Sequence, residues 1–278
     1  MRKSNGPGNR FIIYVLLVIG GGIFIIPFLF MIFTSVKPIT EIHTVPITFF
    51  PHHLRLANYV DAFTVQPMGR YFLNSAIVTS LNVVGMVISC TLAGWGFSRA
   101  NFWGRNFLFL LVLSTMMIPG QVTLIPLYLI FSRLHWVNTF LPLVVPAFFA
   151  AAPYNVFLVR QFFLSLPHEL DEAAVIDGCG PVRVFWSIGL PLVRPAVVTV
   201  AVFTTVFTWS DFFQPLIYLS SNKLFTVALG LTAYQAEGFV YWNYLMAAST
   251  VAVLPVLLVF LFFQRYFVKG LAATGLKE

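Results

Sequence analysis

The chain alternates between long apolar segments and short polar ones. Six apolar segments are each long enough for a helix to cross a bilayer, which takes about 20 residues. They lack the strict alternation of apolar and polar positions that a membrane-spanning β-strand requires. Because a backbone in lipid must satisfy its own hydrogen bonds, we predict six transmembrane helices, at residues 11–33, 72–97, 107–132, 137–159, 196–220 and 245–263.

One polar interruption, residues 164–195, differs from the others in its charge. Between Arg160 and Arg183 it carries four acidic residues and no Lys or Arg. An acidic helix without basic residues nearby suggests that its partners lie on another molecule. The acidic residues are Glu169, Asp171, Glu172 and Asp177.

The residue pattern of this interruption predicts two short helices. Pro167 suits a helix start, and acidic residues in the first turn complement the helix dipole. Gly178 can take the left-handed conformation that ends a helix, and Pro181 can begin the next one. The second helix ends near Pro191, before the fifth apolar segment.

Small and aromatic residues in the same loop favour a docking surface over a plain connector. Ala173, Ala174 and Gly178 leave room for another backbone to approach closely. Phe185 and Trp186 can either fill a pocket on a partner or wedge the loop against the chain's own helices.

The distribution of basic residues predicts the orientation in the membrane. With the N-terminus inside, eleven of the 16 Lys and Arg residues lie on the inner side and five on the outer side. The positive-inside rule therefore places both termini and the 164–195 loop in the cytoplasm. This bias also explains the formal charge of +7, so no nucleic-acid partner is expected.

Composition agrees with a single polytopic helical protein. Hydrophobic residues make up 59% of the chain and charged residues 9%, against about 25% charged in soluble domains. The first apolar segment follows a basic stretch but is longer than the core of a signal peptide, so we interpret it as a retained helix. We expect a cytoplasmic N-terminus at residues 1–10 and one transmembrane domain at residues 11–278.

A carboxylate inside the fifth segment is a candidate functional group. Asp211 is the one ionisable residue clearly within a predicted helix, where such groups are costly and often functional. It either lines a pathway or gate, or is a helix-end carboxylate bonded to a neighbouring helix. Trp209, and Gln121 beside the helix-bending Pro119, are further pathway candidates.

The outer segment 221–244 is rich in aromatic and polar residues. Its aromatic side chains can form an interfacial belt, or they can contact a sugar or an external partner. We take four residues as candidates for such contacts: Tyr234, Gln235, Glu237 and Trp242.

No metal or disulfide site is expected. Cys90 lies in the second apolar segment and Cys179 in the cytoplasmic loop, far apart on this topology and in a reducing compartment. The adjacent pair His52-His53 has no nearby Cys or carboxylate partner in the sequence, so we interpret it as loop histidines.

The 164–195 loop resembles the EAA loop of ABC importer permeases. The match consists of Glu172-Ala173-Ala174-x-x-Asp177-Gly178, then Ile188-x-Leu190-Pro191-Leu192 and Pro195. Cys179 is a departure, since the family usually has Ala there. Further matches to carbohydrate-importer permeases of the MalG type run almost the whole length: Phe50-Pro51, Asn58-Tyr59, Met117-Ile118-Pro119, Trp209-x-Asp211-Phe212 and Gln264-Arg265-Tyr266.

The resemblance implies a fold and a set of partners. The fold is all-α, the type I ABC importer permease fold with six transmembrane helices and a cytoplasmic two-helix EAA coupling loop, in the plasma (inner) membrane of a prokaryote. The partners are a homologous second permease in a heterodimer, two ABC ATPase subunits, an extracytoplasmic solute-binding protein and membrane lipid. ATP and Mg would bind the ATPase subunits, so this chain holds no cofactor and catalyses no reaction.

The same resemblance implies which loop residues couple ATPase closure to alternating access. They are Glu172, Ala173, Ala174, Asp177, Gly178, Cys179 and Phe185. Two other functions remain as alternatives. An intramembrane enzyme would need a catalytic motif such as HExxH or GxSxG, and an ion-coupled carrier would need several buried ionisable residues; the sequence contains neither.

Overall fold

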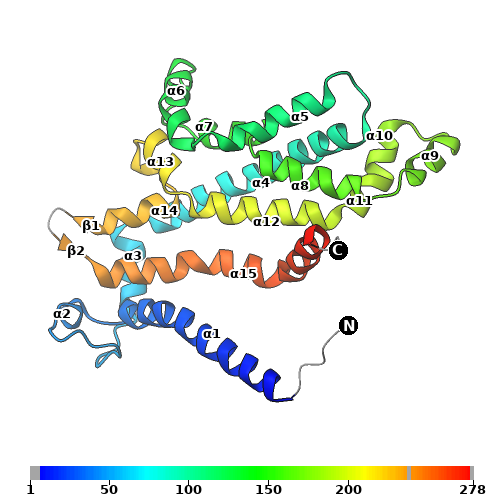
Figure 1. Ribbon diagram of the computed structural model, residues 1–278. Coiled ribbons are helices and arrows are strands. Elements are labelled where there is room, and N and C mark those ends of the chain that lie inside the picture. Colours follow the sequence, from blue (N-terminus) through cyan, green and yellow to red (C-terminus); the bar gives the residue numbers. More distant parts are fainter. Residues whose placement is uncertain (1–6, 237–238, 276–278) are drawn as a thin grey trace. The chain divides into compact units, whose positions relative to one another are not determined.

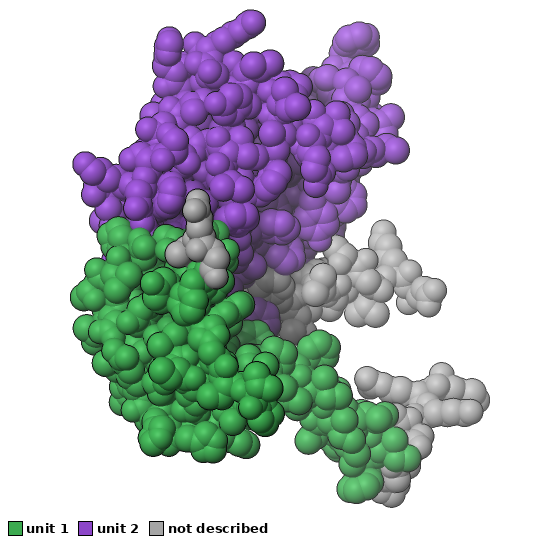
Figure 2. Space-filling view, turned by 90° about the vertical axis from the view of Figure 1, so that its left-hand side faces the viewer, with its two compact units in different colours: residues 1–68, 231–253 green, residues 69–230, 254–278 purple. Residues whose placement is uncertain are grey.

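We analysed a computed structural model that describes residues 7–236 and 239–275, with side-chain surroundings for residues 11–235 and 239–264. The described chain is almost entirely helical (Figure 1). It divides into two compact units, coloured separately in Figure 2. Unit 1 comprises residues 1–68 and 231–253, and unit 2 comprises residues 69–230 and 254–278.

Unit 1 combines a long N-terminal helix with the outer loops. Its elements are α1 (Pro7–Ser35), α2 (Ile39–Ile42), α3 (Ala57–Val65), η5 (Leu231–Tyr234), β1 (Gln235–Ala236), β2 (Phe239–Val240) and the first part of α15 (Trp242–Gly275). The two strands form an antiparallel hairpin in which Gln235 pairs with Val240.

Buried amides hold unit 1 together. The Asn58 side-chain amide donates to the Ser35 and Lys37 carbonyls, both at 2.8 Å. The Asn243 amide in α15 donates to the Asn58 side-chain oxygen at 3.1 Å. These bonds stabilise the turn after α1, because buried polar groups without partners would cost free energy.

Unit 2 contains most of the remaining helices. They are α4 (Met68–Arg99), α5 (Arg105–Ser114), η1 (Thr115–Met117), α6 (Gly120–Arg133), α7 (Leu141–Val144), η2 (Val145–Phe149), α8 (Pro153–Leu164), α9 (Glu169–Ile176), α10 (Pro181–Val184), η3 (Phe185–Gly189), α11 (Leu190–Leu192), α12 (Arg194–Ser210), α13 (Phe213–Tyr218), η4 (Asn222–Leu224) and α14 (Val227–Gly230). Helices α4, α8 and α12 lie side by side (Figure 1).

Close packing of these three helices forms the main apolar core. Cys90 from α4, Val159 and Phe163 from α8, and Val200 from α12 are all buried in one cluster. A Cβ on Gly94 would lie 2.7 Å from Cγ1 of Val159, so only glycine allows α4 to approach α8 this closely.

The described residues contain four helices long and apolar enough to cross a membrane, or up to six if each of two bent pairs is one span. The first bent pair, residues 105–117 and 120–133, turns by 102° beside Pro119, so the predicted helix at 107–132 is broken there and not only bent. Pro126 lies inside α6 without interrupting it.

The second bent pair agrees with the prediction at its start, where the loop helix ends before the fifth segment, and differs from it at its end. The chain turns by 75° between residues 181–192 and 194–210, and α12 ends at Ser210 instead of continuing to residue 220. Seventeen residues make a helix of about 25 Å, shorter than the roughly 30 Å hydrocarbon core. Asp211 leaves the helical conformation, with φ −69° and ψ 117°, and a new short helix follows.

Candidate functional site

The 164–195 loop contains the predicted helix, stop and restart. Helix α9 runs from Glu169 to Ile176, and the next helix begins at Pro181. Gly178 takes φ +79°, the left-handed conformation expected of the residue that ends a helix. From Pro181 the backbone stays helical through a π-helical turn at 185–189 to Leu192, and α12 begins at Arg194 after the 75° bend.

An arginine from α4 attaches the start of α9 to the core of unit 2. Arg99 Nε lies 3.1 Å from Asp171 Oδ2, with the arginine side chain only 5% exposed. Its Nη2 donates to the Leu166 carbonyl at 2.8 Å, and its Nη1 lies 2.7 Å from His168 Nδ1. The Nε–H is not aligned for a hydrogen bond to the carboxylate, so the contact with Asp171 is a charge pair.

This contact corrects the interpretation of the loop's charge. The prediction that the acidic residues find their partners on another molecule is wrong for Asp171, because Arg99 is distant in sequence but adjacent in space. Glu172, Glu169 and Asp177 are exposed, and the described residues include no ion pair for them.

Aromatic packing attaches the second part of the loop. The Phe185 ring is 5% exposed and lies 5.6 Å from Trp95 and 6.5 Å from Phe163 between ring centroids. A Cβ on Gly189 would lie 2.8 Å from Trp95 Cζ3. Phe185 therefore wedges the loop against its own helices, whereas Trp186 is 59% exposed.

The opposite face of the loop is open to a partner. Glu172, Ala173, Asp177 and Gly178 are exposed, Cys179 is partly exposed, and Ala174 is buried. Large apolar side chains of the same loop are exposed as well: Leu170, Val175, Ile176, Val182 and Trp186. A segment that exposes both apolar and acidic side chains is typical of an interaction site.

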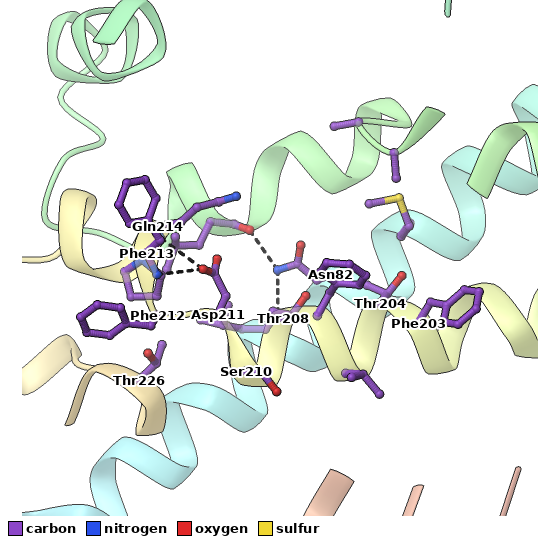
Figure 3. Close-up of a pocket in the computed structure, with 18 of the residues that line it drawn as sticks. Asn82, Phe203, Thr204, Thr208, Ser210, Asp211, Phe212, Phe213, Gln214 and Thr226 are labelled. Carbon is purple, nitrogen blue, oxygen red and sulfur yellow. Dashed lines mark hydrogen bonds between the residues drawn. The ribbon is translucent and has the colours of Figure 1, made fainter. Parts of the chain in front are cut away.

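A cavity of about 950 Å³ lies at the far end of α12 (Figure 3). Its walls come from α4, α7, α8, α12 and α13, together with Ala151 and Ala152 before α8, the Asp211-Phe212 turn and Thr226. Asp211 lines this cavity, but the other two pathway candidates do not. Trp209 lies 5.9 Å from Phe72 between ring centroids, and Gln121 is exposed in the first turn of α6.

The Asp211 carboxylate caps the start of α13. Its Oδ1 accepts from the backbone N–H groups of Phe213 at 3.0 Å and Gln214 at 3.2 Å. Such bonds satisfy amides that have no partner within the helix. Asp211 is therefore a helix-end carboxylate, and it also lines the cavity.

Other polar residues share the cavity with Asp211 and were not among the predicted pathway residues. The Asn82 amide donates to the carbonyls of Val78 and Leu143, both at 2.9 Å. Thr204 and Thr226 are 6% and 3% exposed, and their hydroxyls have no hydrogen-bond partner in the described part of the chain. The sequence feature that could have indicated these residues is the presence of Asn and Thr within apolar segments. Such residues also occur as ordinary contacts between packed helices.

The outer candidates have different surroundings. Tyr234 is 1% exposed, and its hydroxyl donates to the Ala62 carbonyl at 2.6 Å, so it supports unit 1 and presents no ring to a partner, contrary to the prediction. Gln235 is exposed and Trp242 is 39% exposed. Glu237 lies outside the described residues.

The adjacent histidines bind a carboxylate through their backbone. The His52 and His53 N–H groups donate to the Glu41 carboxylate at 2.8 and 3.3 Å. The His52 amide is the main cause that lowers the pKa of Glu41 below its ordinary value. In the described residues, no three His, Cys, Asp or Glu side chains gather as a metal site would need, and Cys90 and Cys179 are free thiols.

Comparisons with known proteins agree with this arrangement. A solved chain from a bacterial ABC transporter involved in import of the acidic polysaccharide alginate has the same fold, with a TM-score of 0.83. It is 19% identical, and the match covers 95% of this chain and 99% of that one.

Several curated relatives are sugar permeases. The arabinooligosaccharides transport system permease AraQ of Halalkalibacterium halodurans is 34% identical over 100% of both chains. The sulfoquinovosyl glycerol permease SmoH of Agrobacterium fabrum is 32% identical over 98% of this chain and 95% of its own. The diacetylchitobiose uptake permease NgcG of Streptomyces coelicolor is 33% identical over 95% and 88%.

A family model also matches directly. It describes the "binding-protein-dependent transport system inner membrane component" and matches residues 85–273, which include the whole 164–195 loop and the cavity end of α12. The chain therefore belongs to the family of inner-membrane permease components of binding-protein-dependent ABC transport systems.

Proposed function

We propose that this chain is a transmembrane permease subunit of an ATP-driven carbohydrate importer. It forms half of the translocation pathway together with a homologous permease. Two ABC ATPase subunits supply the ATP hydrolysis, and an extracytoplasmic binding protein delivers the sugar. The names of the relatives support a sugar cargo, because three of them are permeases for sugars or sugar derivatives.

The observation that carries the proposal is the two-sided structure of the 164–195 loop. Arg99 and Phe185 attach its inner side to α4 and α8. Its outer side exposes Glu172, Asp177 and several apolar side chains. A rigidly attached segment with an open docking face can transmit a partner's movement to the helix that follows it, which is α12.

The docking face predicts the chemistry of its partner. Because Glu172 and Asp177 are exposed, we expect basic groups on the ATPase surface that binds them. The exposed apolar residues of the loop would fit an apolar groove on the same surface. The loop then lies in the cytoplasm with both termini, as the basic residues predict. Gln235 and Trp242, in the outer segment, are the candidates for contact with the binding protein.

The test uses the complete complex reconstituted in vesicles. Gly178→Leu places a branched side chain at φ +79°, where L-residues are disfavoured by roughly 1–2 kcal/mol, and adds bulk to the docking face. We expect ATP-driven sugar uptake to fall at least about tenfold while the permease still inserts.

Gly180→Ala is the matched control. Gly180 has φ −72°, and a Cβ there meets nothing within 4 Å, so uptake should stay near wild type. Sugar uptake by the wild-type permease without any ATPase subunit would contradict the proposed function. Normal co-purification of Gly178→Leu with the ATPase would contradict the docking contact.

A further inference from the structure

We infer that the cavity beside α12 is a subsite through which this subunit itself binds an uncharged saccharide during import. The inference rests on the proposed function, since it assumes a sugar cargo. It goes further because it assigns a sugar-binding site to this chain. The proposed function alone would also allow the partner permease to hold the sugar by itself. The cavity volume of about 950 Å³ is at the upper end of the range for small-molecule sites.

Aromatic rings supply the apolar part of the site. Tyr154 from α8 and Phe203 from α12 lie 6.1 Å apart between ring centroids and both line the cavity. Phe212 and Phe213 line it near Asp211 (Figure 3). Sugar rings have faces of C–H groups, and flat aromatic surfaces cover such faces while polar groups nearby fix the orientation.

Unpartnered hydroxyls supply the polar part. Thr204 and Thr226 are both more than nine-tenths buried, and each leaves its hydroxyl without a partner among the described residues. Leaving a buried polar group unpaired is unfavourable, so native structures usually pair it. Both residues line the cavity, and rotation about χ1 that turns a hydroxyl toward the cavity would let a sugar hydroxyl pair with it.

The charge of the lining selects among sugars. Asp211 is the one charged residue among the described residues that line the cavity, and none of them is Lys, Arg or His. A carboxylate accepts hydrogen bonds from sugar hydroxyls but repels an anionic sugar, and the repulsion is stronger inside a protein than in water. The solved chain belongs to a transporter for the acidic polysaccharide alginate, so an uncharged cargo would distinguish this chain from it.

The experiment measures sugar binding to the intact complex in nanodiscs, without the binding protein, by equilibrium dialysis. The neutral probes are arabinotriose, galactobiose, diacetylchitobiose and maltotriose. The anionic probe is digalacturonate, which differs from galactobiose in the oxidation of C6. We expect at least one neutral probe to bind and digalacturonate to bind at least about tenfold more weakly than galactobiose.

Two variants locate the binding in the cavity. Thr204→Val removes an unpartnered hydroxyl without changing the side-chain shape, and we expect affinity for the bound neutral probe to fall about tenfold. Thr205→Val is the matched control, because Thr205 is adjacent on α12, bonds the Ala201 carbonyl and does not line the cavity. Asp211→Asn should raise the affinity for digalacturonate relative to galactobiose.

Three results would overturn the inference: no binding of any neutral probe, equal binding of galactobiose and digalacturonate, or equal effects of Thr204→Val and Thr205→Val. The proposed function fails separately. If uptake depends on the ATPase but the cavity variants bind like wild type, only the subsite is lost. If the cavity binds sugar but uptake needs no ATPase, only ATP coupling is lost.

Discussion

The two ends of α12 differ in their surroundings and in the residues that form them. At its start, the helix continues a loop attached by an arginine and a phenylalanine, and the loop's outer face displays acidic and apolar groups. At its end, the helix stops at Asp211 beside a cavity that keeps polar groups inside. In the proposed function one end contacts another protein, and in the further inference the other end binds a saccharide.

The difference shows how a single helix can link a docking face to a binding site. The two ends are about 25 Å apart, too far for direct contact. α12 has 17 residues and packs along α8, so under the proposed function it would transmit a shift at the loop to the wall of the cavity as a rigid element. Changes at each end should therefore separate docking from sugar binding.

The largest expected effect comes from Gly189→Val at the loop end. The added Cβ would meet Trp95 at 2.8 Å and Phe163 at 3.3 Å, and overpacking of this kind costs roughly 1–3 kcal/mol. We expect lower thermal stability in detergent and loss of ATP-driven uptake. Wild-type stability of this variant would show that Trp95 can yield and that the loop is not rigidly attached.

The next effect comes from Arg99→Ala. The change removes the charge pair with Asp171 and the bond to the Leu166 carbonyl, and bonds to charged groups are worth about 1.5–3 kcal/mol. We expect faster amide exchange across α9 and weaker coupling of ATPase activity to uptake. Arg99→Lys keeps the positive charge but lacks the planar set of N–H donors, so its exchange rate in α9 should lie between those of wild type and Arg99→Ala. If amide exchange in α9 is unchanged in Arg99→Ala, then Arg99 does not hold α9 in place.

A smaller effect is expected from Asp211→Ala at the cavity end. Loss of the cap should destabilise the start of α13 by about 1 kcal/mol, seen as faster amide exchange at Phe213 and Gln214. Asp211→Asn keeps an acceptor oxygen and should largely preserve these amides. If both variants exchange equally fast, the charge, and not the hydrogen bonds, stabilises the turn.

The smallest effect lies outside both regions, in the outer loop of unit 1. The pKa of Glu41 is lowered mainly by the His52 amide, so its carboxylate stabilises the loop fully above the ordinary glutamate pKa of about 4.3. That stabilisation is lost as the pH falls through the lowered pKa. Exchange at the His52 and His53 amides should differ between wild type and Glu41→Gln at pH 7 and converge at low pH.

Glu41→Gln is also a control for the comparison. Neither ATPase coupling nor sugar binding should change, because Glu41 contributes to neither end of α12. A loss of either activity would mean that the outer loop acts on unit 2 through a route separate from the loop and the cavity.

The sequence predicted the elements whose causes are local. Pro119 marked the break before α6, Gly178 the left-handed residue after α9, and Pro181 the start of the next helix. These features depend on backbone conformation and hydrogen bonds within about four residues, which a pattern of residue types records directly. The family followed from motifs in the same segments.

Other features were decided by packing between distant segments. The partner of Asp171 is Arg99, the last residue of α4. The partners of Phe185 are Trp95 and Phe163. Five helices line the cavity, and Tyr234 is buried with its hydroxyl bonded to a carbonyl of α3. Nothing in local spacing separates Asp171 from Glu172, or Tyr234 from Gln235; burial and partners depend on which side chains the folded helices bring together.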